Sequence, residues 1–398
     1  MSELDFLDRI DLASVSEHPH RLAALDAFRA AGFPTRRDEA WHFTDLKARM
    51  RDFDWAQKGD QAVLALPDLS WAGVVLRDGI WDAASSRPAP FMSRLVRDEV
   101  VRAGSTALVA LNAALGQDGV EMVLRDGEEG GTVMMVAQAG ASAQPITPRY
   151  RVVLGAQATL TIIEVAQGSG AYVHDPVWDI TLGPGARLDH YRLQDESVQS
   201  VHIATVFVAM GEAAHYNGFT LAVGASLARS EFHVALNGAR GDVHLNAAQL
   251  LTGRQHGDVT TVIAHKAPLG ASRQTVKSVI DGAARGVFQG RIEVDRIAQK
   301  TDGYQMNQAL LLSPEAEIDS KPELEIFADD VKCSHGATIG ALDPEQIFYL
   351  RSRGIAEADA RALLIRAFLT EALEPIGESM ARPLFEAAIE GWWRRAAL

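Results

Sequence analysis

The sequence predicts a mainly β protein in which a long β region is flanked by an N-terminal and a C-terminal helical domain. Three observations predict this fold class. Apolar residues have helical spacing at both ends of the chain, short runs rich in β-branched and aromatic residues dominate the middle, and a glycine recurs there at a nearly constant interval. We therefore expect three domains, over residues 1–118, 119–342 and 343–398.

The N-terminal domain is expected to begin with a helix at residues 19–32. Leu22, Leu25 and Phe28 would then share one face, and the glycine at 32 followed by Pro34 is a typical helix end. In the next segment, RRDEAWHFTDLKARM, three large apolar side chains are expected in the core, namely Trp41, Phe43 and Leu46.

A second N-terminal helix is expected from Ser105, as its N-terminal cap, to a stop near Gly116. Between these helices, residues 52–90 have weak periodicity and many turn-forming residues. The pattern predicts no particular structure for that segment.

The β region contains a repeat. Glycines recur with intervals of 28, 28, 30 and 29 residues, at positions 155, 183, 211, 241 and 270. A period of this size indicates a stacked architecture, in which each unit buries its apolar face against its neighbours. We expect these glycines at strand corners, where a positive φ is often needed. A β-sandwich with glycine in its turns is the alternative interpretation.

Helical spacing returns after Asp343. A helix is expected from Pro344 to a stop at Gly354, and a second amphipathic helix ends before Pro375. The run RPLFEAAIEGWWRRAAL predicts a last helix. Flanking helices of this kind are one way to cover the ends and faces of a stacked β region.

Composition and missing motifs exclude several classes of function. The 38 Lys and Arg against 52 Asp and Glu give a net charge of −14, which disfavours binding to nucleic acid or anionic membranes. The sequence lacks a GxxxxGK[ST] phosphate loop, a helix-opening GxGxxG, HExxH, CxxC and GxSxG. An acidic start, MSELDFLDRI, and a single cysteine favour a cytoplasmic location. We expect no ATPase activity and no catalytic site of its own.

The single cysteine lies in the segment DDVKCSHGATIG. If VKCSH is a strand, Cys333 and His335 point to the same face. The imidazole could then activate the thiol as a nucleophile, or both could ligate a metal; the third possibility is that Cys333 is a small buried side chain. Because a metal site needs about four ligands, two residues make half a site. The missing ligands would come from another chain or a small molecule.

Three histidines of the β region lie near Asp242 and Asp258, namely His244, His256 and His265. A metal site formed by them is one hypothesis. Solvated or hydrogen-bonded core histidines are the alternative.

Three segments resemble the SufB/SufD family of iron–sulfur cluster assembly scaffold subunits, and most resemble its SufD branch. They are RRDEAWHFTDL, LDPEQIFYLRSRGI and the long segment from Gln289 to Gly340, which contains AQKTDGYQMNQALLLS and ADDVKCSHGAT. The resemblance implies a right-handed parallel β-helix between helical domains. SufB, which shares the ADDVKCSHGAT-type segment, is the nearest alternative, although SufB proteins usually contain more cysteines.

The resemblance also implies partners and site residues. A SufB-type paralogue would bind through its β-helix, and Cys333 and His335 would lie where a transient iron–sulfur cluster forms between the two chains. The lone chain would hold no stable cofactor. A SufC-type ABC ATPase would bind the C-terminal helices, through Ile347, Phe348, Tyr349, Leu350, Arg351, Arg353, Leu364 and Phe368. Whether the isolated chain forms a homodimer, and whether a flavin binds the complex, is left open.

Two rival classes remain at this point. A β-helix carbohydrate-active enzyme, such as a pectate lyase, is usually secreted and carries clustered charged residues, whereas the acids here are dispersed. A thiol hydrolase would need a third positioned group and an oxyanion hole beside Cys333.

Overall fold

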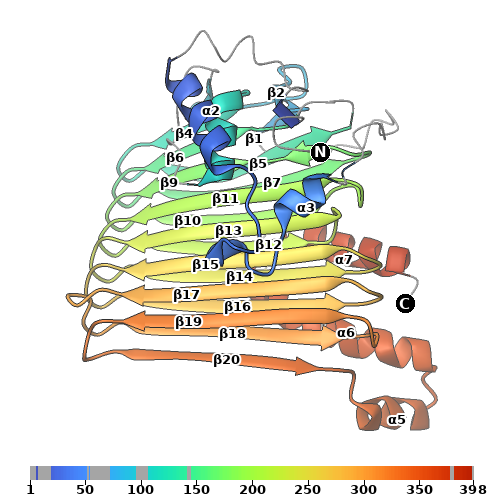
Figure 1. Ribbon diagram of the computed structural model, residues 1–398. Helices are drawn as coiled ribbons and strands as arrows, with labels where there is room; N and C mark the ends of the chain where they lie inside the picture. The colour runs from blue at the N-terminus through green and yellow to red at the C-terminus, as the bar shows by residue number, and fades with distance from the viewer. Residues whose placement is uncertain are drawn as a thin grey trace.

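The computed structural model describes residues 6–7, 19–51, 53, 72–95, 106–140, 145–376 and 381–396. Its centre is a parallel β-solenoid formed by two facing sheets, with helices on the outer surfaces (Figure 1). The stacked architecture predicted from the glycine repeat is therefore confirmed, and the β-sandwich is excluded. None of the helices in the described residues has the length and apolarity required to cross a membrane.

From Gly119 onward, apart from one two-residue strand, successive strands alternate between the two sheets, so that each sheet pairs every second strand of the chain. The first sheet contains, in spatial order, β2 (Ile80–Trp81), β1 (Ala72–Arg77), β5 (Glu129–Ala139), β7 (Thr159–Gly168), β10 (Arg187–Asp195), β12 (His215–Ala222), β14 (Asp242–Leu251), β16 (Ala271–Ile280), β18 (Asp302–Leu311) and β20 (Lys332–Gly340). The second contains β19 (Glu317–Ile326), β17 (Arg285–Val294), β15 (His256–His265), β13 (Leu227–Leu236), β11 (Val201–Met210), β9 (Val177–Leu182), β6 (Arg149–Leu154), β4 (Gly119–Leu124) and β3 (Met92–Leu95), with β8 (Val173–His174) beside β11. All pairs are parallel except β1 with β2 and β3 with β4.

Helices cover both outer faces of the solenoid. Those of the N-terminal region lie on the second sheet: α2 (Pro19–Ala31), the 3₁₀ turn η1 (Glu39–Trp41), α3 (Leu46–Arg51) and α4 (Ala107–Leu115). Those of the C-terminal region begin with α5 (Pro344–Ser352), and pack against the first sheet through α6 (Glu357–Leu373), η2 (Glu374–Ile376) and α7 (Arg382–Ala396).

Strand alternation divides the apolar residues among three cores. Within β11, Val206 and Val208 point between the two sheets, whereas Val201 and Ile203 point outward against the N-terminal helices. On the first sheet, outward residues such as Phe219 pack on α7. Where both faces are covered, as at β11, the strand is a near-continuous apolar run, whereas the last strand of the second sheet, β19, is polar and uncovered along much of its length.

The repeated glycines are required for close packing. None of the five has a positive φ; instead, the left-handed residue of each corner lies nearby, as at Gln157, two residues after Gly155. A Cβ at Gly155 would lie 2.5 Å from the backbone nitrogen of Asp126 in the preceding turn, and one at Gly183 would lie 2.9 Å from that of Ala156. The prediction of glycine at the corners is confirmed, but the expected backbone conformation is wrong. At Gly155, Gly183 and Gly211 the backbone of the preceding turn lies too close for a side chain, whereas at Gly241 and Gly270 the nearest atoms belong to side chains.

Two details of the predicted helices are also corrected. The buried face of α2 contains Arg21, Leu25 and Phe28, whereas Leu22 is exposed. The guanidinium of Arg21 is buried because it donates to the C-terminal carbonyls of α4. The N-terminal cap of α4 is Thr106, while Ser105 lies outside the described residues; the stop at Gly116 is confirmed.

Candidate functional site

The candidate site lies at the end of the solenoid where the chain leaves the two sheets. Strands β19 and β20 are the last of their sheets, and in the described structure each pairs with a neighbouring strand on one side only. Their free edges carry backbone donors and acceptors that a further strand could use. This end, at the bottom of Figure 1, is therefore open to a second β-structure.

Cys333 and His335 both point toward the interior of this last turn. They are two residues apart in β20 and pair in register with Gly303 and Gln305 of β18, whose side positions face inward. The sulfur of Cys333 packs at the edge of a small apolar cluster that includes Ile292. His335 is exposed because no further turn covers it in the described part of the chain. The structure thus places the two predicted site residues on one face.

The thiol is half-buried, and its environment keeps it protonated. Burial raises the pKa of Cys333, the nearby carboxylate of Asp302 raises it further, and a hydrogen bond from the backbone of Gly303 opposes this. A Cβ at Gly303 would lie 3.4 Å from the sulfur of Cys333, so the absence of a side chain at Gly303 provides space for the thiol. The lone chain therefore does not activate this thiol as a nucleophile. A cation or metal from outside the chain would be needed to favour the thiolate.

The interior beside this pair is polar. Gln305 and Asn307 are fully buried, and they donate to the Glu323 carbonyl over 3.2 Å and to Ser320 Oγ over 2.9 Å. Their amide oxygens have no hydrogen-bond partner in the described part of the chain. In the segment AQKTDGYQ, strand alternation places Gln305 inward, but the alternation is informative only once the inner face is known.

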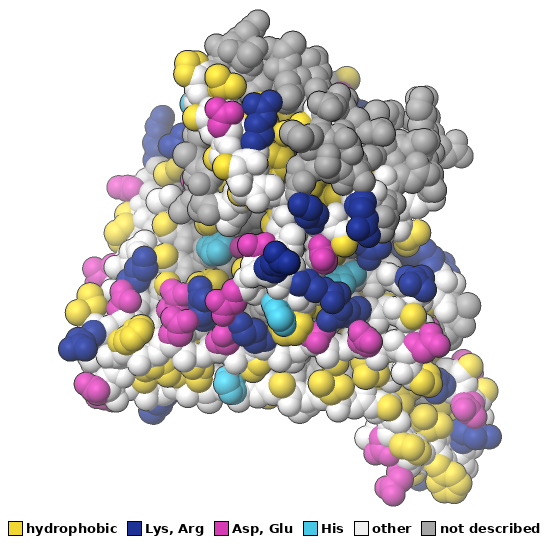
Figure 2. Space-filling view, viewed as in Figure 1, with side chains coloured by type: hydrophobic (Ala, Val, Ile, Leu, Met, Phe, Trp, Pro, Cys, Tyr) yellow, Lys and Arg dark blue, Asp and Glu magenta, His cyan; other side chains and the backbone are white. Residues whose placement is uncertain are grey.

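The rim of the open end is apolar and exposed. Ile326 and Phe327 lie at the end of β19, Ile339 lies in β20, and their exposed fractions are 38%, 64% and 55%. Figure 2 shows hydrophobic side chains along this lower edge and on α5. Sequence reasoning missed these residues, because an alternating strand does not reveal whether another turn covers it. An exposed apolar rim beside free strand edges is typical of a protein interface.

The C-terminal helices form a second exposed surface, which we call the α5–α6 groove. It is a hollow of about 670 Å³, lined by Asp343, Glu345, Gln346, Phe348, Tyr349, Leu350, Ser352, Leu363 and Leu364. No residue of α5 is buried, and Phe348 is 74% exposed. Four of the eight predicted ATPase-binding residues, Phe348, Tyr349, Leu350 and Leu364, line this groove.

The other four lie around the groove. Ile347 is half-buried. Arg353 stacks 4.9 Å from the Tyr349 ring, and Arg351 forms an exposed ion pair. Phe368 instead faces the solenoid, where Lys277 Nζ lies 4.5 Å from its ring centre. Phe368 therefore helps hold α6 on the first sheet.

The three histidines proposed as a metal site are not brought together. His244 is exposed on the first sheet and lies 3.6 Å from Asp242. His256 and His265 lie at opposite ends of β15 in the second sheet. Burial lowers the pKa of both to about 4, and His256 is hydrogen-bonded to Thr44 over 2.8 Å. These histidines are structural, apart from the exposed His244.

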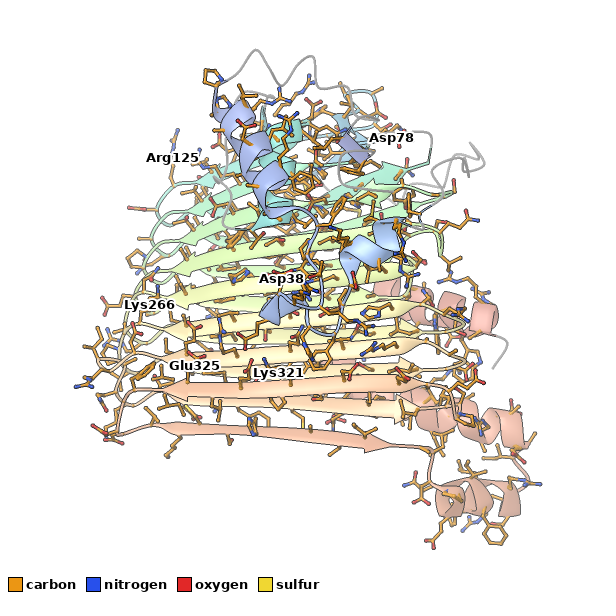
Figure 3. All side chains as sticks on the ribbon, in the orientation of Figure 1. Asp38, Asp78, Arg125, Lys266, Lys321 and Glu325 are labelled. Atoms are coloured by element: carbon orange, nitrogen blue, oxygen red, sulfur yellow. The ribbon has the colours of Figure 1, made fainter. Side chains whose placement is uncertain are left out.

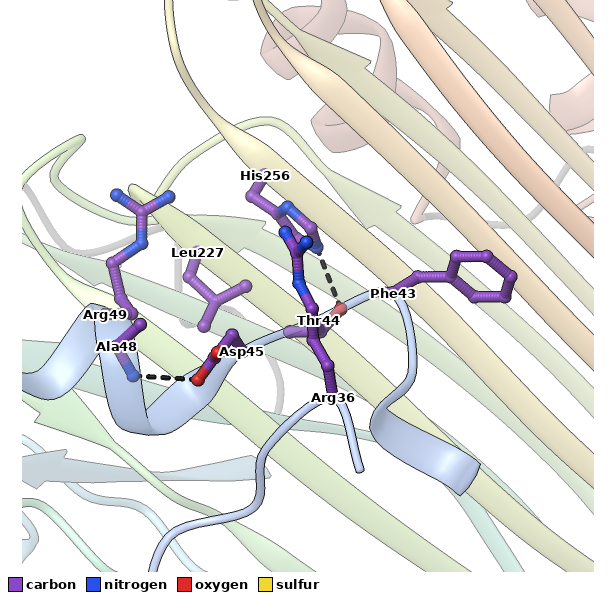
Figure 4. A pocket seen from close by; sticks show the side chains of 8 residues that line it. All are labelled: Arg36, Phe43, Thr44, Asp45, Ala48, Arg49, Leu227 and His256. Atoms are coloured by element: carbon purple, nitrogen blue, oxygen red, sulfur yellow. Dashed lines mark hydrogen bonds between the residues drawn. The ribbon is translucent and has the colours of Figure 1, made fainter. Parts of the chain in front are cut away.

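The motif RRDEAWHFTDL forms a strap across the second sheet. Figure 4 shows the cavity under it, of about 260 Å³, where the Thr44 side chain meets His256. Deeper in, the Arg229 guanidinium lies 4.0 Å from the Trp41 ring. Near the open end, Lys321 pairs with Glu39 of the strap over 3.2 Å; Figure 3 labels Lys321 and Asp38, the residue before Glu39. The strap thus ties the N-terminal region to the last turns.

Comparison with known proteins gives one family. The family model described as "SUF system FeS cluster assembly, SufBD core domain" matches residues 135–368. An iron–sulfur cluster assembly SufBD family protein of Synechocystis is 33% identical, over 89% of this chain and 86% of its own length. The iron–sulfur cluster assembly protein SufD of Escherichia coli is 32% identical over 90% of both chains. A chloroplastic Arabidopsis thaliana protein, ABCI7, is 36% identical over 57% of this chain and 49% of its own length.

Proposed function

The chain belongs to the SufBD family of iron–sulfur cluster assembly proteins, and from this premise we propose that it is a SufD-type, non-enzymatic scaffold subunit. Its open end would join the corresponding end of a SufB-type paralogue. Cys333 and His335 would then contribute ligands to a cluster, or to its iron and sulfide, between the two chains. The single observation that carries this proposal is that both residues face into an uncovered last turn.

Three features of the open end support a heterodimer of this kind. The free edges of β19 and β20 can continue two parallel sheets into a partner. The rim of Ile326, Phe327 and Ile339 supplies apolar area that association would remove from water. A protonated, half-buried thiol with one imidazole nearby is an incomplete site, so ligation depends on the second chain.

We propose further that the α5–α6 groove binds a SufC-type ABC ATPase, which would supply the nucleotide chemistry that this chain does not perform. The groove is apolar at its centre, with Phe348 and Leu363 exposed, and has charged residues at its margin. That combination is typical of a pocket for a partner's helix or loop. A cytoplasmic location fits such an assembly.

The cluster site is tested by substitution in the assembled complex. Cys333→Ser and His335→Ala are each expected to lower the iron and acid-labile sulfide content of the co-expressed complex by about tenfold, because each removes a ligand that the partner cannot replace. Both variants should still co-purify with the SufB-type and SufC-type partners. Ser334→Ala is the matched control, since Ser334 lies between them on the opposite face of β20. Normal cluster content in both variants would refute the site.

The groove is tested separately. Phe348→Ser should weaken binding of the ATPase by roughly thirtyfold, seen as its loss in co-purification, because a buried aromatic contact at an interface is worth about 2 kcal/mol or more. Val198→Ser, at another residue that is 61% exposed, should leave it unchanged. Equal loss in both variants would argue against a specific site.

A further inference from the structure

A second group of metal-ligating side chains lies inside the solenoid, away from the open end. His174, Glu196 and His202 offer one ligand atom each, and these atoms all lie within 4.8 Å of one another. His174 ends β8, His202 lies in β11 directly opposite it in register, and Glu196 follows β10. The three side chains therefore come from two neighbouring turns of the solenoid.

The geometry is set by strand alternation. Val173 and Val201 point outward and pack under the N-terminal helices, so that His174 and His202, the next residues, point between the sheets. The rings lie edge to face with centres 5.0 Å apart. Nδ1 of His174 lies 3.0 Å from one oxygen of Glu196, and Nδ1 of His202 lies 2.6 Å from the other. Both nitrogens are thus directed at a single carboxylate.

Hydrogen bonding leaves this cluster incomplete. His174 and His202 are each 1% exposed and Glu196 is 4% exposed. Despite its short approach to Glu196, Nδ1 of His202 has no partner with suitable hydrogen-bond geometry in the described residues, and neither has Nε2 of His174. Nε2 of His174 is thus a buried imidazole nitrogen without a partner, and such a group calls for an ion or a water.

The charge of Glu196 is also uncompensated. Two other buried acids have a guanidinium: Glu164 lies 2.6 Å from Arg192 Nε, and Glu231 pairs with Arg229. Within the described residues, Glu196 pairs with no Lys or Arg. A buried carboxylate without a guanidinium or ammonium beside it is costly in the solenoid interior unless another cation joins it.

We propose that His174, Glu196 and His202 bind one divalent transition-metal ion of the zinc class inside the solenoid. Two imidazoles and a carboxylate are a common protein ligand set for Zn²⁺. Metal bonds of about 2.0–2.2 Å would place ligand atoms about 3–3.5 Å apart, so that the 3.0 Å separation of His174 and Glu196 already fits, while the 2.6 Å separation of His202 and Glu196 would widen on binding. The ion would cross-link the two turns under the N-terminal helices.

Protonation states are consistent with this site. Burial lowers the pKa of His202, so the imidazole is neutral at pH 7. Burial alone would raise the pKa of Glu196, but His202 and His174 outweigh it and hold that pKa well below its usual value. Because the site is buried, the ion would enter during folding.

The test uses the full-length chain carrying Cys333→Ser, so that the terminal thiol cannot bind metal. After expression with zinc and extensive dialysis, one equivalent of zinc per chain is expected by elemental analysis. Glu196→Gln, which keeps the shape but removes the charge, should lower it to below about 0.1 equivalent, because a ligand is lost. Glu164→Gln is the matched control and should retain zinc, since Arg192 already balances that acid.

A zinc content below about 0.1 equivalent in the parent chain, or equal zinc in the Glu196→Gln variant, would overturn the proposal. If Glu196→Gln does not fold, X-ray absorption of the parent chain decides. Two imidazoles in a nitrogen and oxygen shell are expected, and a shell without imidazole would refute the site. Neither result depends on the cluster site, because the Cys333→Ser background removes its thiol.

Discussion

Replacement of Arg229 by alanine should destabilise the protein strongly, because this residue joins the N-terminal strap to the solenoid. Its guanidinium is fully buried and donates to Asp258 over 2.5 Å and to Glu231 over 2.9 Å. It also donates to the carbonyl of Ala40 over 2.9 Å and stacks on Trp41. One side chain thus satisfies two buried acids and a turn of the strap.

The magnitude follows from what the substitution leaves behind. In Arg229→Ala, Asp258 would keep the hydroxyls of Thr44 and Thr260, and Glu231 would keep His233, but neither acid would have a guanidinium. Removing one partner of a buried ion pair costs about 3–5 kcal/mol, since a charge remains buried without compensation. The same substitution also removes the cation–π contact between Arg229 and Trp41. Its energy is already part of this loss, because contacts made by one side chain are not independent.

Urea unfolding of the purified chain, followed by circular dichroism, measures this loss. We expect a fall of about 3–5 kcal/mol in the free energy of unfolding for Arg229→Ala. Arg151→Ala, which breaks a partly exposed pair with Glu121 at 3.1 Å, should cost less than about 1 kcal/mol. If the two variants lose equal stability, the buried network does not stabilise the strap, and the reasoning fails.

Three further predictions concern the solenoid. Gly155→Ala should lower the free energy of unfolding by about 1–3 kcal/mol, because its Cβ would meet backbone 2.5 Å away. Gly253→Ala has open space around its Cβ but a φ of 64°, so backbone strain should cost only about 1–2 kcal/mol. A larger loss for Gly253→Ala in thermal unfolding would contradict this. Burial lowers the pKa of His265 to about 4, so the unfolded state binds a proton at a higher pH than the folded state. The free energy of unfolding should therefore fall by up to about 3 kcal/mol as the pH drops from 6.5 to 4. His265→Gln should make this pH dependence less steep, and an unchanged dependence would show that His265 does not cause it. Lys277→Ala removes a fully buried ammonium that donates to the Phe368 carbonyl over 3.0 Å. The variant should speed limited proteolysis of the C-terminal helices several-fold. An unchanged rate of proteolysis would show that Lys277 does not anchor α6.

Much of the fold was predictable because it depends on local and periodic features. The recurring glycines at 155, 183 and 211 record the length of one solenoid turn, and the helices after Pro344 follow from spacing and caps. The reason for those glycines was not predictable. A Cβ at Gly155 collides with a turn about thirty residues earlier in the chain, and such a contact exists only after stacking.

The candidate site was only partly predictable for the same reason. The spacing of Cys333 and His335 implied a common face, and the structure has them on one face. The exposure of His335 depends on β20 being the last strand of its sheet in the described residues, which no local pattern encodes. Phe327 at the rim is exposed, and the α5–α6 groove is hollow, because of how neighbouring strands and helices are placed in space.

The sequence by itself determined the periodicity of this protein, the thiol–imidazole pair and the resemblance to a family, since each is a property of residue order. Only the tertiary structure decided which strand faces are covered and which polar groups meet inside. His174 and His202 lie 28 residues apart, and nothing local relates them; they become neighbours because one solenoid turn has that length. Burial and contact between turns are properties of the stacked chain, so chemistry that depends on them appears only when the turns are assembled.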